Sequence, residues 1–397
     1  MSTTSSPRPQ GPLAGTKIIE FGGIGPGPLC SMLLSDAGAT VLRLDRQTAS
    51  GLGVPRGQNY DVQRRGRQSL AIDLKNPAAK EAILKLVESA DGVLDPFRPG
   101  TLEKLGLGPD VLLARNPRLV FTRITGWGQS GPMAKTAGHD INYLSITGVL
   151  DAIGPKDGRP CPPLNVVADM GAGAMFSAFG MLAAIISARN TGRGQVVDSA
   201  MCDGSAYLAA GVFGMLQEGN FELQRESNLL DGGAPFYGTF ETSDGLYMAI
   251  GAIERKFFDI AMDKLDIDGS VWGNHLDKIH WPQMMAQIKA AFATKTRDQW
   301  STIFEGCDAC VSPVLNFTEA MSYPHNVARN NLPEFNGVNQ PAPAPVFCGT
   351  PGAIQFPPPR FGEHSEQSLS EWGFSDAEIA ELQRQDAIGS DGYTANT

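Results

Sequence analysis

The first third of the chain alternates short apolar runs with helical patterns, and this alternation limits the possible folds more than any other feature. It is typical of a parallel sheet covered by helices. Pro28, at the first position of a predicted helix, and Gly38, just past its end, agree with this pattern. The predicted strands are 17–21, 40–44, 69–72, 92–94 and 119–124, and the predicted helices are 28–37 and 80–90.

The pattern of predicted elements changes near Gly232. Strands at 236–240 and 246–250, joined by Ser243-Asp244-Gly245, are expected to form a hairpin. Helical patterns follow it, so the sequence predicts a second, smaller α+β domain. The remaining predicted elements are helices at 171–188, 199–216, 255–265, 281–293 and 297–305, a surface crossing at 336–359, and a helix at 375–385 capped by Ser375 with Glu378.

Composition and charge exclude several classes of protein. The 397 residues are 42% hydrophobic and 19% charged, as in soluble globular proteins. A net charge of −10 argues against a nucleic-acid partner. We expect no membrane span, because no apolar run approaches roughly 18 residues. Residues 1–10 lack the apolar core of a signal peptide, so a cytoplasmic location is predicted. Cys307 and Cys310 lack the further ligands of a metal site, so none is expected.

The turn Gly22–Gly27 resembles the phosphate-binding loop of dinucleotide enzymes, because a strand precedes it and Asp45 follows about twenty residues later. However, Cys30 stands where the third glycine should be. Pro26 and Pro28 also remove backbone N–H groups that would bind a pyrophosphate. A tight turn that leads into a helix is therefore the favoured interpretation.

Basic side chains gather near the ends of the predicted strands. Because the ends of parallel strands meet at one edge of a sheet, these cations could form a single anion site. Ordinary solvated surface charge is the alternative, and spacing alone favours it. The five cations are Arg43, Arg46, Lys75, Arg98 and Lys104.

Three further residues suggest a function only when they are considered together. His139 lies in a glycine-flanked loop before a helix, where a lone histidine is more often structural. Asp169 directly precedes a long apolar helix, where an N-cap role is the plainer interpretation. A helix start also presents unpaired N–H groups that could hold an oxyanion. Glu254 would by itself be taken for a surface residue.

Taken together, these residues resemble the family III coenzyme A transferases and the racemase branch of that family. The resemblance runs from about Pro12 to Leu382. It rests on six stretches: Leu13-Ala14-Gly15, Asp36-Ala37-Gly38-Ala39, Arg98-Pro99-Gly100, Thr125-Gly126-Trp127-Gly128-Gln129-Ser130-Gly131-Pro132, Gly192-Arg193-Gly194-Gln195-Val196-Val197-Asp198 and Gly362-Glu363-His364-Ser365-Glu366.

The resemblance implies an α/β fold with a Rossmann-like large domain and a smaller α+β domain. Two linkers would close the subunit into a ring, and two rings would interlock as a homodimer. The implied segments are 1–200 (large domain), 201–228 (linker helix), 229–320 (small domain), 321–335 (return linker) and 336–397 (completion of the large domain). The implied coenzyme A contacts are Ile24, Arg46, Leu74, Lys75, Arg98, Lys104, Gly138 and Tyr143.

Two chemistries exist in this family. Its transferases use the aspartate that matches Asp169 as an acyl-accepting nucleophile, and they carry four consecutive glycines in the small domain. Its racemases pair that aspartate with a histidine matching His139 and a supporting glutamate matching Glu254. The chain has both partners and reads Asp231-Gly232-Gly233-Ala234 in place of the glycine run. The resemblance therefore implies cofactor-free inversion of the α-carbon of 2-methylacyl-CoA thioesters, with transferase chemistry as the enzymatic alternative and coenzyme A binding without catalysis as the other.

Overall fold

The computed structural model describes residues 10–47, 51 and 53–389, and the chain divides into two compact units. The larger unit consists of three stretches of chain, which end at Thr147, run over Leu164–Leu208 and resume at Ala328. The smaller unit combines Gly148–Pro163 with Ala209–Val327. The chain therefore enters the smaller unit between His139 and Asp169, and again after Leu208.

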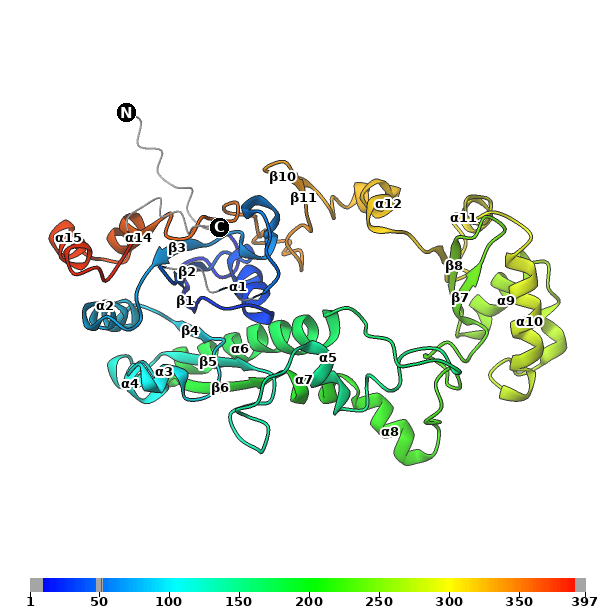
Figure 1. Ribbon diagram of the computed structural model, residues 1–397. Coiled ribbons are helices and arrows are strands. Elements are labelled where there is room, and N and C mark those ends of the chain that lie inside the picture. Colours follow the sequence, from blue (N-terminus) through cyan, green and yellow to red (C-terminus); the bar gives the residue numbers. More distant parts are fainter. Residues whose placement is uncertain (1–9, 48–50, 52, 390–397) are drawn as a thin grey trace. The chain divides into compact units, whose positions relative to one another are not determined.

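A six-stranded parallel sheet forms the centre of the larger unit (Figure 1). Its strand order is β3-β2-β1-β4-β5-β6, the order of doubly wound dinucleotide-binding sheets. The five predicted strands are confirmed with shifts of a residue or two at their ends, and the sixth was not predicted. The strands are β1 (Lys17–Phe21), β2 (Thr40–Asp45), β3 (Gln68–Ala71), β4 (Gly92–Asp95), β5 (Val120–Thr125) and β6 (Gln195–Ala200).

Successive side chains of these strands point to opposite faces of the sheet, and both faces are buried. Ile18 and Val41 face α1 (Pro26–Asp36) and α6 (Phe176–Thr191). Their neighbours Ile19 and Leu42 belong to the core on the other face. That face is covered by α2 (Pro77–Glu88), α3 (Thr101–Lys104), α4 (Pro109–Arg115), α14 (Ser365–Glu371) and α15 (Asp376–Arg384). Ser375 and Glu378 cap α15 reciprocally, as predicted.

The long apolar helix differs from its prediction. A π-helical segment, Val166–Met175, continues directly into α6, so Asp169 lies inside the helix and Asn165 occupies the N-cap position. The 26 residues Val166–Thr191 are long and apolar enough to cross a membrane by length and composition, which corrects the expectation that no run approached this length. Met181, Ala184 and Ile185 are buried against the sheet, as in the core helix of an α/β unit.

The chain leaves the sheet in two helices rather than the single one predicted at 199–216. β6 extends to Ala200, and α7 (Met201–Leu208) follows it within the larger unit. The helix α8 (Ala210–Glu218) belongs to the smaller unit. The short helix α5 (Asp140–Ser145) and the 3-10 turns Gln58–Tyr60 and Val62–Arg64 complete the first part of the larger unit.

The smaller unit contains the predicted hairpin, β7 (Tyr237–Glu241) with β8 (Tyr247–Gly251), and a third strand, β9 (Val311–Pro313), that was not predicted. Phe236, Phe258 and Phe292 are fully buried in its aromatic core. Its helices are α9 (Arg255–Lys264), α10 (Trp281–Phe292), α11 (Arg297–Phe304) and α12 (Phe317–Ser322), with 3-10 turns at Gly269–Trp272 and Lys278–His280, and α13 (Pro324–Ala328) leads out of it.

The returning chain crosses the larger unit largely without regular structure, as predicted for 336–359. It carries one short hairpin, β10 (Glu334–Phe335) with β11 (Val338–Asn339). Further along, Gly66 N–H donates to the carbonyl of Phe356, and the Gln58 amide donates to that of Pro358. These bonds attach the returning segment to the loop before β3.

Candidate active site

The order of the strands reverses between β1 and β4, and the loops after these strands meet there. The glycine turn, defined here as Gly22–Pro28, follows β1, and Pro96 follows β4. A Cβ atom built on Gly23 would lie 2.5 Å from Pro96 Cγ, so this contact requires glycine. Gly25 has φ 74°, in the left-handed region that glycine tolerates. Such a reversal is where open α/β sheets bind ligands.

Asp169 lies beside the glycine turn. A Cβ atom built on Gly25 would be 3.8 Å from Asp169 Oδ2, and Asn165 Nδ2 donates to the same oxygen at 3.4 Å. Burial, and to a lesser extent the Asp140 charge, raise the pKa of the Asp169 carboxyl to about 6, while the Asn165 hydrogen bond and the charge of His139 oppose this rise. A carboxyl group with this pKa can both hold and release a proton near neutral pH.

His139 is exposed at the N-cap position of α5, in extended backbone. The backbone N–H of His139 donates to Asn142 Oδ1 at 3.1 Å, and this bond fixes the start of the helix. The structure brings the two predicted acid/base residues near one another, because Asp140, the residue after His139, accepts the backbone N–H of Asp169 at 2.7 Å.

Asp140 was missed in the sequence. Its side chain is buried, and Oδ2 accepts the backbone N–H of Asp169 at 2.7 Å. That N–H is therefore not free to hold an oxyanion, which corrects the expectation for the start of the Asp169 helix. The available signal was an acidic residue in the first turn of α5, but its partner lies 29 positions away.

Tyr143 and Gly138 fix the loop that carries His139. The Tyr143 hydroxyl donates to the carbonyl of Gly138, and its ring packs edge-on against Trp127 at 4.8 Å. A Cβ atom on Gly138 would lie 2.6 Å from the Tyr143 ring, so only glycine fits. Burial, then the charge of Asp169, raises the pKa of Tyr143 to about 12, while Arg98 lowers it. Tyr143 therefore stays a hydrogen-bond donor.

Six of the eight expected coenzyme A contacts follow four adjacent strands of the sheet. Ile24 is partly exposed after β1, and Arg46 is exposed after β2. Leu74 and Lys75 follow β3, and Arg98 follows β4 with Lys104 at the end of α3. These residues thus follow strands that are neighbours in the order β3-β2-β1-β4, and their contact with coenzyme A stays a prediction.

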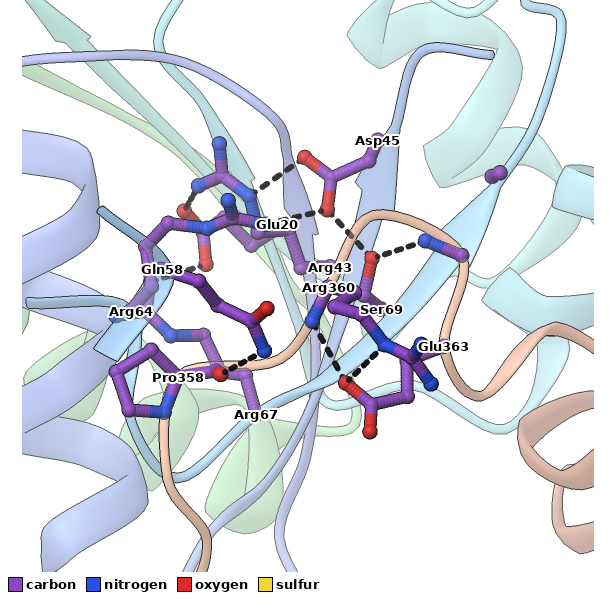
Figure 2. Close-up of polar contacts among 12 residues, drawn as sticks. Glu20, Arg43, Asp45, Gln58, Arg64, Arg67, Ser69, Pro358, Arg360 and Glu363 are labelled. Carbon is purple, nitrogen blue, oxygen red and sulfur yellow. Dashed lines mark hydrogen bonds and ion pairs between the residues drawn. The ribbon is translucent and has the colours of Figure 1, made fainter. Parts of the chain in front are cut away.

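Arg43 departs from the predicted set of cations. It is buried within β2, where Nε donates to Asp45 Oδ1 at 2.8 Å and Nη1 contacts Glu20 (Figure 2). Its charge is neutralised inside the protein, so Arg43 is not available to an anion at the surface. The prediction was wrong because both faces of the sheet are buried, so Arg43 lies inside the protein, where the carboxylates of Asp45 and of the sequence-distant Glu20 make burial of its charge tolerable.

Glu254 lies in the smaller unit, exposed at the N-cap position of α9. Its pairing with His139 would join residues of the two units and stays a prediction. The Asp231-Gly232-Gly233 turn has a local structural role, since Asp231 Oδ1 accepts the N–H groups of Asn228 and Gly233 at 2.9 and 3.0 Å.

Comparisons with known proteins agree with this geometry. Residues 13–365 match the model of CoA-transferase family III. Human α-methylacyl-CoA racemase is 41% identical over 389 residues, which cover 97% of this chain and 99% of the relative. The succinyl-CoA–D-citramalate CoA-transferase of Chloroflexus aurantiacus is 28% identical, with 97% and 100% covered. A CAIB/BAIF family protein from Brucella suis superposes with a TM-score of 0.77 at 25% identity, with 91% and 100% covered.

A strand order that reverses beside Asp169, together with a match over nearly the whole chain, shows that the protein belongs to CoA-transferase family III.

Proposed function

We propose that the protein is a racemase that inverts the α-carbon of 2-methylacyl-CoA thioesters by a 1,1-proton transfer. The observation that carries this proposal is the Asp169 carboxyl, whose pKa is raised to about 6 beside His139. The 41% identity to human α-methylacyl-CoA racemase supports the same chemistry. The enzyme is thus an isomerase that needs no cofactor besides its coenzyme A substrate.

In the proposed reaction, the two residues work on opposite faces of the α-carbon. Neutral His139 removes the α-proton, the C–H electron pair passes into a thioester enolate, and protonated Asp169 supplies a proton to the other face. The reverse reaction begins with ionised Asp169 and protonated His139. One partner must therefore hold a proton while the other is free, which suits a carboxyl group whose pKa is raised to about 6.

Substrate anchoring is assigned to the carboxyl edge of the sheet. The exposed side chains of Arg46, Lys75, Arg98 and Lys104 offer cations for the phosphates of coenzyme A. Gly138 and Tyr143 lie next to His139, where the thioester end of the substrate is expected. Glu254 is proposed to bind the imidazole of His139 and to fix its tautomer.

We also propose a homodimer of interlocked rings, each formed by two domains and two linkers. Support comes from apolar side chains on the outer side of the long helix, where Met175, Phe179 and Ile186 are half-exposed or more. Isolated exposed apolar residues are common, but a row on one helix marks an interaction surface. The oligomeric state can be measured by sedimentation of the full chain.

Deuterium incorporation tests the proposed function. In heavy water, the wild type should exchange the α-proton of either enantiomer of a 2-methylacyl-CoA ester and should form the other enantiomer. His139→Ala should retain exchange only of the enantiomer whose proton faces Asp169, and Asp169→Ala only of the other. Either change should lower net inversion by about 10²–10⁴-fold.

The transferase alternative is separated by a second experiment. Incubation of the acyl-CoA with a labelled free acid would give labelled acyl-CoA if Asp169 accepted the acyl group. Wild-type protein that transfers label but exchanges no α-proton is a transferase. Binding of the ester with neither reaction would identify a coenzyme A-binding protein instead.

A further inference from the structure

Five charged side chains form a buried ionic cluster, three from the last residues of β1 and β2 and two from the segment directly before β3 (Figure 2). Each is at most 9% exposed, and burial of an ion costs several kcal/mol unless it is paired. Well-packed apolar residues would fill the same space at less cost, so the arrangement of donors matters more than the stability gained. The cluster consists of Glu20, Arg43, Asp45, Arg64 and Arg67.

Arg43 joins this cluster to the glycine turn. Two of its nitrogens contact Asp45 and Glu20, and Nη2 donates to the backbone carbonyl of Gly23 at 3.1 Å. Because the guanidinium is planar and rigid, the two carboxylates also fix the direction of the third donor. The Asp45 carboxylate stays charged. Although burial opposes ionisation, the nearby charges of Arg43 and Arg64 hold the pKa of Asp45 below its usual range.

A second guanidinium holds the far end of the same turn. Arg67 Nη1 donates to the other oxygen of Glu20 at 2.8 Å, and Nη2 donates to the carbonyl of Pro28 at 2.9 Å. Glu20 therefore orients both arginines, and the turn is fastened at Gly23 and at Pro28.

The first part of the turn lies outside regular structure: the Gly22 N–H donates to the carbonyl of Leu44 at 2.9 Å, and helix α1 begins only at Pro26. Glycine gains the most chain freedom when released, and Pro26 and Pro28 have no N–H to donate. The turn is also in contact with the helix of Asp169. Gly25 approaches Asp169 Oδ2, and a Cβ atom on Gly173 would lie 2.8 Å from the side chain of Pro26. Any movement of the turn therefore changes the wall beside the Asp169 carboxyl.

We propose that Arg43 is a positioning residue: through its bond to Gly23, it holds the glycine turn against the Asp169 carboxyl and thereby supports proton transfer. The reaction in this inference rests on the function proposed above, whereas the bracing of the turn does not. If the turn loosens, water can enter beside the Asp169 carboxyl, and the carboxyl is displaced. Such a displacement reduces turnover more than substrate binding, since Ile24 is the one expected coenzyme A contact in the turn, whereas the cations assigned to coenzyme A lie elsewhere.

Arg43→Lys tests this role in the full-length protein, because lysine keeps the charge near Glu20 and Asp45 but replaces the three-donor fork with one ammonium group. Arg65→Lys is the matched control. Arg65 is equally buried, and it bonds Asp36 at 2.6 Å and Gln340 at 2.8 Å rather than the glycine turn. Both variants are measured for thermal midpoint, for kcat and KM, and for amide hydrogen exchange of the peptide that spans residues 22–34.

For Arg43→Lys we expect faster amide exchange in that peptide, a kcat lowered about 10- to 100-fold, and a KM within about threefold of the wild type. Arg65→Lys should lower the thermal midpoint about as much as Arg43→Lys does, but its kcat should be nearly unchanged. Arg67→Lys should repeat the Arg43→Lys pattern, and it decides the matter if Arg43→Lys does not fold.

Unchanged amide exchange at residues 22–34 would overturn the bracing of the turn. Faster exchange with unchanged kcat would overturn its importance for the reaction, as would equal losses of kcat in Arg43→Lys and Arg65→Lys. If the wild type exchanges no α-proton, the proposed function is wrong, and the amide-exchange result still decides whether Arg43 holds the turn.

Discussion

The backbone N–H of Asp169 donates to Oδ2 of Asp140 at 2.7 Å, so the residue that follows His139 in sequence orients the helix turn that carries Asp169. The two proposed proton carriers are thus connected through one buried carboxylate. Its charge also contributes to the raised pKa of the Asp169 carboxyl, after burial. This relation gives Asp140 two separable effects, one geometric and one electrostatic.

Asp140→Asn should separate these effects, because asparagine keeps an oxygen acceptor but loses the charge. The pKa of Asp169 should fall, so the acid limb of exchange for the enantiomer facing Asp169 should move to lower pH. At pH 7 that carboxyl is already mostly ionised, and the rate should change by about threefold or less. The measurement is the pH dependence of α-deuterium incorporation for each enantiomer.

Asp140→Ala removes the acceptor as well and serves as the comparison. It should lower kcat about tenfold or more, since the start of the Asp169 helix loses its anchor. An acid limb that does not move in Asp140→Asn would show that the Asp140 charge has no influence on Asp169.

Asp169→Asn should stabilise the fold at neutral pH while removing racemisation. The folded protein binds the Asp169 proton more tightly than the unfolded chain, so ionisation lowers the free energy of unfolding as pH rises from about 4 to 6. A shift of about two units corresponds to about 3 kcal/mol, which solvent reduces to about 1–2 kcal/mol at this partly exposed carboxyl.

Urea unfolding of wild type and Asp169→Asn at pH 7 and at pH 4 measures this difference. The variant should be more stable at pH 7, and the advantage should vanish at pH 4, where the wild-type carboxyl is protonated. The same advantage at both pH values would mean that the stabilisation does not come from the ionisation of Asp169.

The parts of the fold that could be predicted are those set by local patterns. Apolar runs identified five strands of the sheet, and Ser375 with Glu378 identified the start of α15. β6 (Gln195–Ala200) was missed because, unlike the buried β1, its first residues are largely exposed, so the apolar run that marks a buried strand is absent. Strand order was not readable from any local pattern, since it depends on contacts between distant segments.

The site shows the same division. His139 and Asp169 were identified by resemblance, but spacing could not reveal that Asp140 connects them. Arg43 was misjudged as a surface cation because burial depends on a partner, and Glu20 is 23 positions away. A π-helical start to the long helix had no sequence signal. The helix was therefore predicted to begin about one turn too late, with Asp169 at its N-cap rather than inside it.

Removal of a cation at the carboxyl edge of the sheet should weaken substrate binding rather than turnover. Arg98→Ala and Lys75→Ala should each raise KM about three- to tenfold with kcat nearly unchanged, because the nucleotide is held alike in the ground state and the transition state. Lys85→Ala is the matched control, since Lys85 is a partly exposed lysine on α2 that pairs with Glu378. Steady-state kinetics at two salt concentrations checks this, and a loss confined to kcat would mean that the positions are misassigned.

Tyr143→Phe should slow one half of the reaction more than the other. The change removes the hydroxyl that donates to the carbonyl of Gly138, directly before His139, and keeps the ring that packs on Trp127. A single hydrogen bond contributes about 1 kcal/mol, so the fold should survive while the His139 loop gains freedom. Deuterium incorporation should therefore fall about three- to tenfold for the enantiomer whose proton faces His139, and less for the one facing Asp169.

Tyr247→Phe controls for loss of a hydroxyl as such, because Tyr247 is a half-exposed tyrosine on β8 of the smaller unit. Equal slowing of both enantiomers in Tyr143→Phe would show that Tyr143 affects the site as a whole, and not the placement of His139.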